Sequence, residues 1–267
     1  MVGTALVESL VQSIALTHLI RDHHRVSLLL LAAPESGKTT IATAATSRHV
    51  VRVAIITGRS VVRELQTNPH LEFLLFNDLS AVRAMSASAV NLLVTILNQV
   101  TQDERGLIAF AGKETEQIER ACGIIGCMPF KTFRDHRARW RELGFISRMI
   151  PFAYSYPAEL VATIKDRIDD AAPRTKTRRG ALPRRGRRPI AIAMSTRLTK
   201  QLRHLSDARA SSLGQIGLRL LQNYHALVRG HALLSDRHAV TSADLDWLRL
   251  VDQHVSIDTC RPLDYAG

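Results

Sequence analysis

The chain has 267 residues, 46% of them apolar, so it is long enough for one α/β core and a smaller unit. Its longest apolar runs are of strand length, so we expect no membrane-spanning helix, and its first residues do not have the pattern of a signal peptide. The formal net charge of +12 is uneven, because eight Lys and Arg residues and no acidic residue lie between Pro173 and Pro189.

Strand-like and helix-like stretches alternate in roughly the first 140 residues. This alternation predicts an α/β fold with a parallel sheet and helices on both faces, with ligand at the carboxyl ends of the strands. We expect strands at 26–31, 51–56, 72–77, 106–111 and 122–128, and helices near 4–20, 38–47, 60–67, 80–101 and 131–143.

The first strand leads into a motif with a chemical meaning. The run Leu28–Leu31 is followed by Ala32–Thr39, which reads Ala-Ala-Pro-Glu-Ser-Gly-Lys-Thr, and then by a helical stretch. A buried strand, a tight loop, Gly-Lys-Thr and a helix form the context of a nucleotide phosphate loop, although Ala32 replaces the usual first Gly. The alternative is a polar turn between a strand and a helix.

In a phosphate loop each residue type has a role. Backbone N–H groups face the phosphates, and Gly37 lets the backbone approach the anion. Lys38 supplies charge to the β and γ oxygens, and the Thr39 hydroxyl binds Mg²⁺. The sequence therefore predicts a site for ATP and Mg²⁺ formed by Pro34, Glu35, Ser36, Gly37, Lys38, Thr39 and Thr40.

The run Leu71–Asp78 predicts a second buried strand that ends in a carboxylate. Asp78 is then placed to hold Mg²⁺ together with Thr39, or alternatively to cap the following helix. Leu79 stands where many such ATPases carry a second carboxylate. In the other register Asn77 takes the metal position and Asp78 that of the base, and Glu35 is another candidate base. Binding of nucleotide is therefore a stronger inference than its hydrolysis.

The basic segment 171–189 predicts a flexible linker and a domain boundary. The arginines and lysine at 174–188 would bind nucleic-acid phosphates in a salt-dependent way, or form a solvated linker without a partner. After it, leucines recur at helical spacing and no strand is evident. We expect a nucleotide-binding domain at 1–170, the linker at 171–189, a helical domain at 190–258 and a tail at 259–267.

The three cysteines do not predict a metal site. Cys122 and Cys127 lie in an apolar strand-like segment without a second pair or a nearby His pair. We expect buried free thiols, which fit a reducing cytoplasm.

The order of these parts resembles that of AAA+ ATPases over nearly the whole chain. Gly106–Phe152 is similar to the clade with a β-hairpin before sensor 1, which includes the minichromosome maintenance helicases. There, Gly106–Gly112 and Ala121–Pro129 would flank or form the hairpin, with Lys113–Arg120 as its polar tip. Trp140–Tyr156 also resembles a group of bacterial and phage-type ATPases with Gly-Phe-x-Ser-Arg followed by Tyr-Ser-Tyr.

The resemblance implies a three-layer αβα domain with a helical lid, and roles for two arginines. Gly144–Pro151 looks like the Ser-Arg-Phe motif, in which Arg148 would be an arginine finger for the γ-phosphate of a neighbouring subunit in a ring or hexamer. Arg219 matches sensor 2, which touches the nucleotide from the lid. Alternatively, Arg148 would form an ordinary surface ion pair, and Arg219 would be a solvated helix residue.

Sensor 1 departs from the family pattern. Its place holds Cys127, Met128 and Pro129 instead of Asn or Thr, and the next such residue is Thr132.

Three functions remain open. One is an oligomeric ATPase with Lys38, Asp78 and Arg148 as catalytic residues, acting on DNA or a DNA-bound partner. The others are a nucleotide switch or loader with weak hydrolysis, and a remodeller of protein partners.

Overall fold

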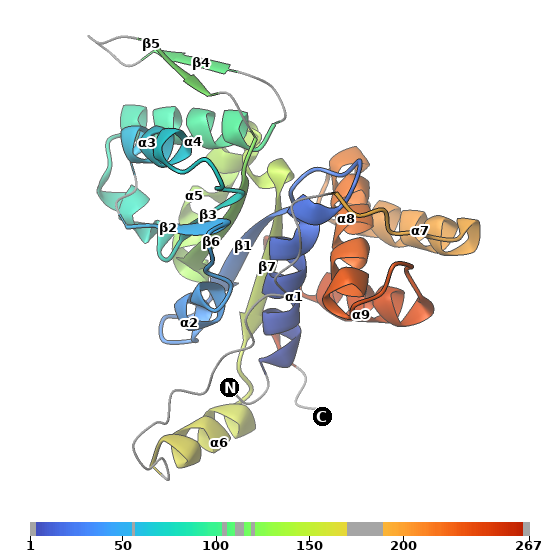
Figure 1. Cartoon of the computed structure of the whole chain (residues 1–267). Helices are drawn as coiled ribbons and strands as arrows, with labels where there is room; N and C mark the ends of the chain where they lie inside the picture. Colours follow the sequence, from blue (N-terminus) through green and yellow to red (C-terminus); the bar gives the residue numbers. More distant parts are fainter. Residues whose placement is uncertain are drawn as a thin grey trace.

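Six strands form one sheet in which every neighbouring pair is parallel, in the order β2-β3-β6-β1-β7-β8 (Figure 1). The computed structural model describes residues 4–54, 57–102, 106–109, 115–118, 121–169 and 189–263. The sheet strands are β1 (Ser27–Ala32), β2 (Val50–Val53), β3 (Phe73–Phe76), β6 (Gly123–Pro129), β7 (Met149–Ser155) and β8 (Arg261–Pro262).

The central strands are buried on both faces, which explains their continuous apolar sequences. All six residues of β1 and all four of β3 are buried, as expected for parallel strands covered by helices on both sides. Two glycines let β6 fit between them. A Cβ atom at Gly123 would lie 2.2 Å from the Phe73 ring, and one at Gly126 would lie 2.6 Å from the Leu79 side chain.

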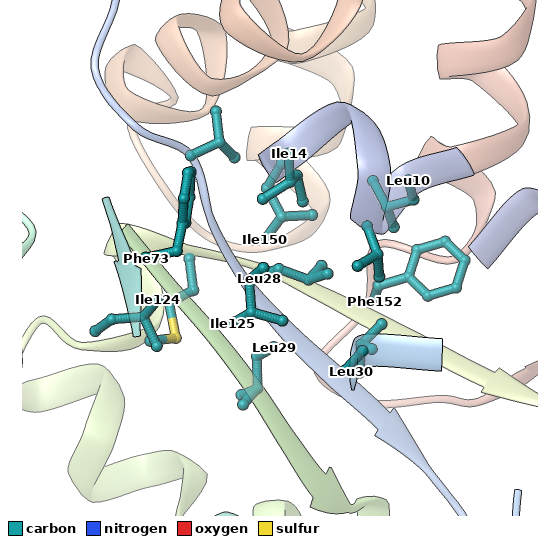
Figure 2. Packing of buried hydrophobic residues seen from close by; sticks show 14 of the residues in the cluster. Leu10, Ile14, Leu28, Leu29, Leu30, Phe73, Ile124, Ile125, Ile150 and Phe152 are labelled. Carbon is teal, nitrogen blue, oxygen red and sulfur yellow. The ribbon is translucent and has the colours of Figure 1, made fainter. Parts of the chain in front are cut away.

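Helices cover both faces of this sheet. Leu10 and Ile14 of α1 lie over Leu28 and Ile150 on one face (Figure 2). On the other face α5 contacts β1 and β6. The helices are α1 (Ala5–Leu16), α2 (Lys38–Thr43), α3 (Gly58–Thr67), α4 (Ala87–Val100), α5 (Phe130–Glu142), α6 (Ala158–Asp169), α7 (Thr196–Ser212), α8 (Leu218–Leu234) and α9 (Ser242–Gln253), with short 3₁₀ helices η1 (Thr17–Leu19), η2 (Leu79–Ala84) and η3 (Ile146–Arg148).

The C-terminal helices share the core of the α/β part. α8 packs along α1, so closely that a Cβ atom at Gly230 would lie 2.4 Å from the Ser13 carbonyl oxygen (Figure 1). The indole N–H of Trp247 on α9 donates to the Ser9 hydroxyl at 3.0 Å. The segment after α9 then runs beside β7, where the backbone N–H of Ser256 donates to the Pro151 carbonyl at 3.0 Å.

The strand expected at 106–111 does not join the parallel sheet. Residues 106–109 form β4 (Gly106–Ala109), which pairs antiparallel with β5 (Thr115–Ile118) in a separate hairpin rather than joining the parallel sheet. The segment expected at the hairpin tip therefore supplies its second strand. The place beside β1 is taken instead by β7, a strand that we did not expect, whose pairing with β1 buries a mixed sequence that includes Pro151 and Tyr154.

A second difference lies in the tail, where we expected no strand. Arg261 and Pro262 form β8 at the edge of the sheet, beside Tyr154 and Ser155 of β7. A proline is tolerated at an edge because only one side of the strand needs hydrogen bonds.

Candidate nucleotide site

The loop between β1 and α2 has the backbone of an anion-binding turn. Glu35 and Gly37 have φ angles of +62° and +72°, in the left-handed region. Gly37 adopts this conformation readily, whereas Glu35 does so at a cost in strain that is typical of functional loops. Turns of this kind, placed before a helix, gather backbone N–H groups around an anion.

Lys38 is turned back into the loop and is only 8% exposed. Its Nζ donates to the carbonyls of Ala32 at 3.1 Å and Ala33 at 2.5 Å, and to the Ser36 hydroxyl at 3.1 Å. Burial lowers the pKa of Lys38, while Cys127, Asp78 and Cys260 act in the opposite direction. The ammonium is thus held by neutral oxygens that a phosphate can replace.

The Asp78 carboxylate caps η2. One oxygen accepts from the Ser80 backbone N–H at 2.8 Å and the other from the Ser80 hydroxyl at 2.7 Å. The side chain is exposed and close enough to Lys38 to influence its pKa. The capping role and a metal role are compatible, because a carboxylate oxygen accepts more than one bond.

Thr39 lies at the same edge of the sheet as Asp78. The Thr39 hydroxyl donates to the Asn77 carbonyl at 3.2 Å. The Asn77 side chain faces the Arg52 guanidinium on β2. Its amide oxygen accepts hydrogen bonds from that guanidinium in the amide orientation that satisfies both side chains.

The residues present fit a Mg²⁺ ion held mainly by phosphate. Within the described ranges, no group of three or more His, Cys, Asp and Glu side chains gathers that could hold a metal alone. A hydroxyl and one carboxylate, from Thr39 and Asp78, are the usual protein share when phosphates and water complete the shell. Thr40, like Thr39, is exposed at the start of α2, while Pro34 and Glu35 are exposed in the loop.

Two tyrosines that the sequence analysis left without a role support the loop from β7. The hydroxyls of Tyr154 and Tyr156 donate to the Ser36 carbonyl at 3.2 Å and 2.6 Å. Burial raises the pKa of both phenols, so both remain donors at neutral pH. Their spacing of two residues at the end of a buried strand, which puts both on one face, is the signal that could have indicated them.

The segment in which the family resemblance places sensor 1 is apolar. Pro129 at the end of β6 pairs with Ala32, so this segment lies beside the phosphate loop. Cys127 is buried, and burial raises the pKa of its thiol to about 12, which leaves it neutral. The first hydroxyl beyond it belongs to Thr132 in the first turn of α5.

Arg148 and Arg219 lie together at the amino-terminal ends of the strands, opposite the carboxyl ends where Lys38 lies. Arg148 precedes β7, whose first residue pairs with Ser27 at the start of β1. Lys38 follows the other end of β1, roughly 16 Å away along a six-residue strand. Arg219, at the start of α8, lines the same cavity as Arg148. In the described conformation Arg219 therefore lies beside Arg148 and not beside Lys38.

This arginine cavity has a volume of about 570 Å³. Arg148 donates to the Gly144 carbonyl at 2.6 Å, and burial, followed by the charge of Arg219, lowers its pKa. His23 and Arg25 also line the cavity, and Arg25 is paired with Glu72 at 2.6 Å. Burial lowers the pKa of His23 to about 4, so its ring is neutral at pH 7.

Two predicted features lie outside the described residues: the basic segment 174–188, and the ends of the hairpin segment at 110–114 and 119–120. In the part of the chain that the structure describes, none of the helices combines the length and the apolar composition needed to span a membrane.

Comparison with known proteins leaves the site to be interpreted from its residues. Neither a protein-family model nor a curated protein matches the chain.

Proposed function

We propose that the chain binds ATP with Mg²⁺ in the loop between β1 and α2 and acts as an AAA+ ATPase. The observation that carries the proposal is the placement of Lys38, whose ammonium is buried in a strand–loop–helix turn. Thr39 and Asp78 lie at the same edge of the sheet, as ligands of a phosphate-bound cation require.

The chemistry follows from exchange of hydrogen bonds. On binding of ATP, the Lys38 ammonium would leave the Ala33 carbonyl and the Ser36 hydroxyl for phosphate oxygens, a stronger charge-assisted bond. The Thr39 hydroxyl and the Asp78 carboxylate would hold Mg²⁺, which neutralises charge on the phosphates. The two tyrosine bonds to Ser36 keep the loop in place during this exchange.

The positions of the arginines favour a site completed by a neighbouring subunit. Arg148 and Arg219 lie at the amino-terminal ends of the strands, which we call the arginine edge, and Lys38 lies at the other ends, the nucleotide edge. Neither arginine therefore reaches the nucleotide of its own chain in this conformation. In a head-to-tail assembly the arginine edge of one subunit would face the nucleotide edge of the next. The two guanidiniums would then stabilise charge that develops on the γ-phosphate.

An alternative is a nucleotide switch with weak hydrolysis. Leu79 and the neutral, buried Cys127 stand where a second carboxylate and a polar sensor are usual. The exposed Glu35 is the nearest acid in the loop that could serve as a base. Action on DNA through residues 174–188, or on a protein partner without nucleic acid, is proposed from the sequence alone.

Titration calorimetry of the purified chain with ATP and Mg²⁺ tests the binding proposal. We expect Lys38→Ala to lower the affinity at least about tenfold, because a charge-assisted contact is lost. Lys200→Ala, which removes an exposed lysine on α7, is the matched control and should bind as the wild type does. Equal affinities of the Lys38→Ala and wild-type chains would contradict the proposal.

A further inference from the structure

Another cavity lies next to the phosphate loop, between the loop, η2, the start of α5 and the end of β7. Its volume is about 560 Å³, which suits a small organic molecule. Part of its wall is apolar or aromatic and comes from Pro34, Phe130 and Tyr154. A body with an apolar surface would be desolvated there.

The cavity adjoins the predicted phosphate site and shares Pro34 with it. Of the loop residues, Ala33 and Pro34 line it, whereas the segment 36–40, which is expected to hold the phosphates, does not. The Lys38 ammonium lies 2.5 Å from the Ala33 carbonyl and marks the end of the loop where the terminal phosphate is expected. A molecule in the cavity would therefore lie beside that phosphate.

The charged groups that line the cavity are all positive. Arg83 and Lys131 are exposed at its wall, and neither forms an ion pair with any part of the chain that the structure describes. None of the described lining residues is an acid. The Cys260 thiol in the wall is neutral at pH 7, because burial raises its pKa to about 11. Two unpaired cations without a carboxylate favour an anion.

The first turn of α5 adds polar groups that lack partners. The helix has 13 residues and begins after Pro129 without a side-chain cap, so its first N–H groups and its dipole favour a negative charge. Thr132 in this turn lines the cavity and is only 3% exposed. Its hydroxyl has no hydrogen-bond partner in the protein among the described residues, and it does not belong to the fully enclosed polar atoms of the core, so it is free to bond a ligand in the cavity.

We propose that this cavity binds a small organic anion with an apolar body. Its carboxylate, sulfonate or phosphate is held by Arg83, Lys131 and the first turn of α5 with Thr132. Its body packs between Pro34, Phe130 and Tyr154. Anion binding depends on these residues alone, whereas its position beside a terminal phosphate rests on the proposed function. Because Pro34 belongs to both the loop and the cavity, the anion and the nucleotide should each alter the affinity of the other.

The fluorescent aromatic sulfonate 8-anilinonaphthalene-1-sulfonate is a suitable probe, since it combines one anionic group with an apolar body. We expect saturable binding at one site, weakened about tenfold or more in the double variant Arg83→Ala with Lys131→Ala, because two charge-assisted contacts are lost. Thr132→Val, which keeps the shape of the side chain, should also weaken binding. Arg134→Ala removes another exposed cation of α5, one turn away and outside the cavity lining, and should bind as the wild type does.

Three results would overturn the inference. In the first, the double variant binds the dye as tightly as Arg134→Ala does. In the second, ATP displaces the dye completely from the wild type but not from Lys38→Ala, which would make the cavity part of the nucleotide site. In the third, dye binding is lost as the chain self-associates, which would mean that a second copy covers the cavity. Dye binding that depends on Arg83 and Lys131, in a chain that does not bind ATP, would support the anion site and contradict only the ATPase proposal.

Discussion

The Ser36 carbonyl is the point at which Tyr154 of β7 and the neighbouring Tyr156 hold the loop between β1 and α2. It accepts hydrogen bonds from the hydroxyls of both Tyr154 and Tyr156, while the Ser36 hydroxyl accepts from Lys38. The chain thus fixes the loop from the strand beside it before any nucleotide is bound. Preorganisation of this kind lowers the entropic cost of binding.

We predict that the double variant Tyr154→Phe with Tyr156→Phe binds ATP about five- to thirtyfold more weakly, since each of the two net hydrogen bonds is worth roughly 1 kcal/mol. Calorimetric titration measures the affinity, and thermal unfolding measures the stability. Tyr224→Phe is the control: its hydroxyl bonds to Asp252 in the C-terminal helices, so it should lose stability but keep its ATP affinity. A double variant that binds ATP as tightly as the wild type would exclude a role in nucleotide binding for the two tyrosine hydrogen bonds to Ser36.

At this scale the sequence predicts what is local. The conformation around Lys38 follows from an apolar strand, a short loop and a helix that are contiguous in the chain. The neighbours of Ser36 and of Arg219 could not be predicted in this way, because they depend on which strand pairs with β1 and on how α8 packs.

At the scale of elements, the contact between α1 and α8 decides where the C-terminal helices lie. Gly230 allows the two helices to approach closely, with the Ser13 carbonyl oxygen where a Cβ atom would be. Additional backbone contacts join the segment after α9 to β7. The helices therefore share one core with the sheet in this conformation.

We predict that Gly230→Ala lowers the stability by at least about 1–3 kcal/mol, because the new methyl group overpacks the helix contact. Thermal or denaturant unfolding measures the change in stability, and its sign distinguishes the two cases. In an open helical site the same change would stabilise the chain by about 1 kcal/mol, since Ala is the better helix former. A stabilised variant would therefore show that α8 is not held against α1.

The strands illustrate how far sequence patterns reach at this scale. β1 and β3 were predictable because a continuous apolar run is typical of a buried parallel strand. Residues 106–109 are similarly apolar, yet they pair within a hairpin, and β7 was missed because Pro151 and Tyr154 interrupt its apolar pattern. Whether such a segment joins the parallel sheet or a hairpin depends on strands that are far away in the sequence, and a local pattern does not contain this information.

At the scale of the whole molecule, an exposed apolar segment before α8 lies next to Arg219, at the arginine edge. Ile216 and Leu218 flank Gly217 at the start of α8 and are 91% and 73% exposed, next to Arg219. Large aliphatic side chains that are this exposed favour burial against a partner. If subunits assemble head to tail through Arg148 and Arg219, these two side chains lie in the interface.

We predict that Ile216→Ser weakens self-association by about fivefold or more, as expected when an apolar interface contact of at least roughly 1 kcal/mol is lost. Sedimentation measured over a range of protein concentrations would detect the change. Leu250→Ser is the control, because Leu250 is a 46% exposed leucine on α9, on another helix. Equal self-association of both variants and the wild type would place the interface elsewhere.

The most direct test of a nucleotide site shared between subunits is ATP turnover by mixtures of two inactive variants. Lys38→Ala subunits lack the loop ammonium but keep the Arg148 guanidinium, and Arg148→Ala subunits keep Lys38 but lack that guanidinium. If the site forms between subunits, each variant alone is inactive, and an equal mixture regains activity at about a quarter of its interfaces by random assembly. A mixture that stays inactive, or an Arg148→Ala protein that turns over ATP at the wild-type rate, would show that Lys38 and Arg148 of neighbouring subunits do not form one site.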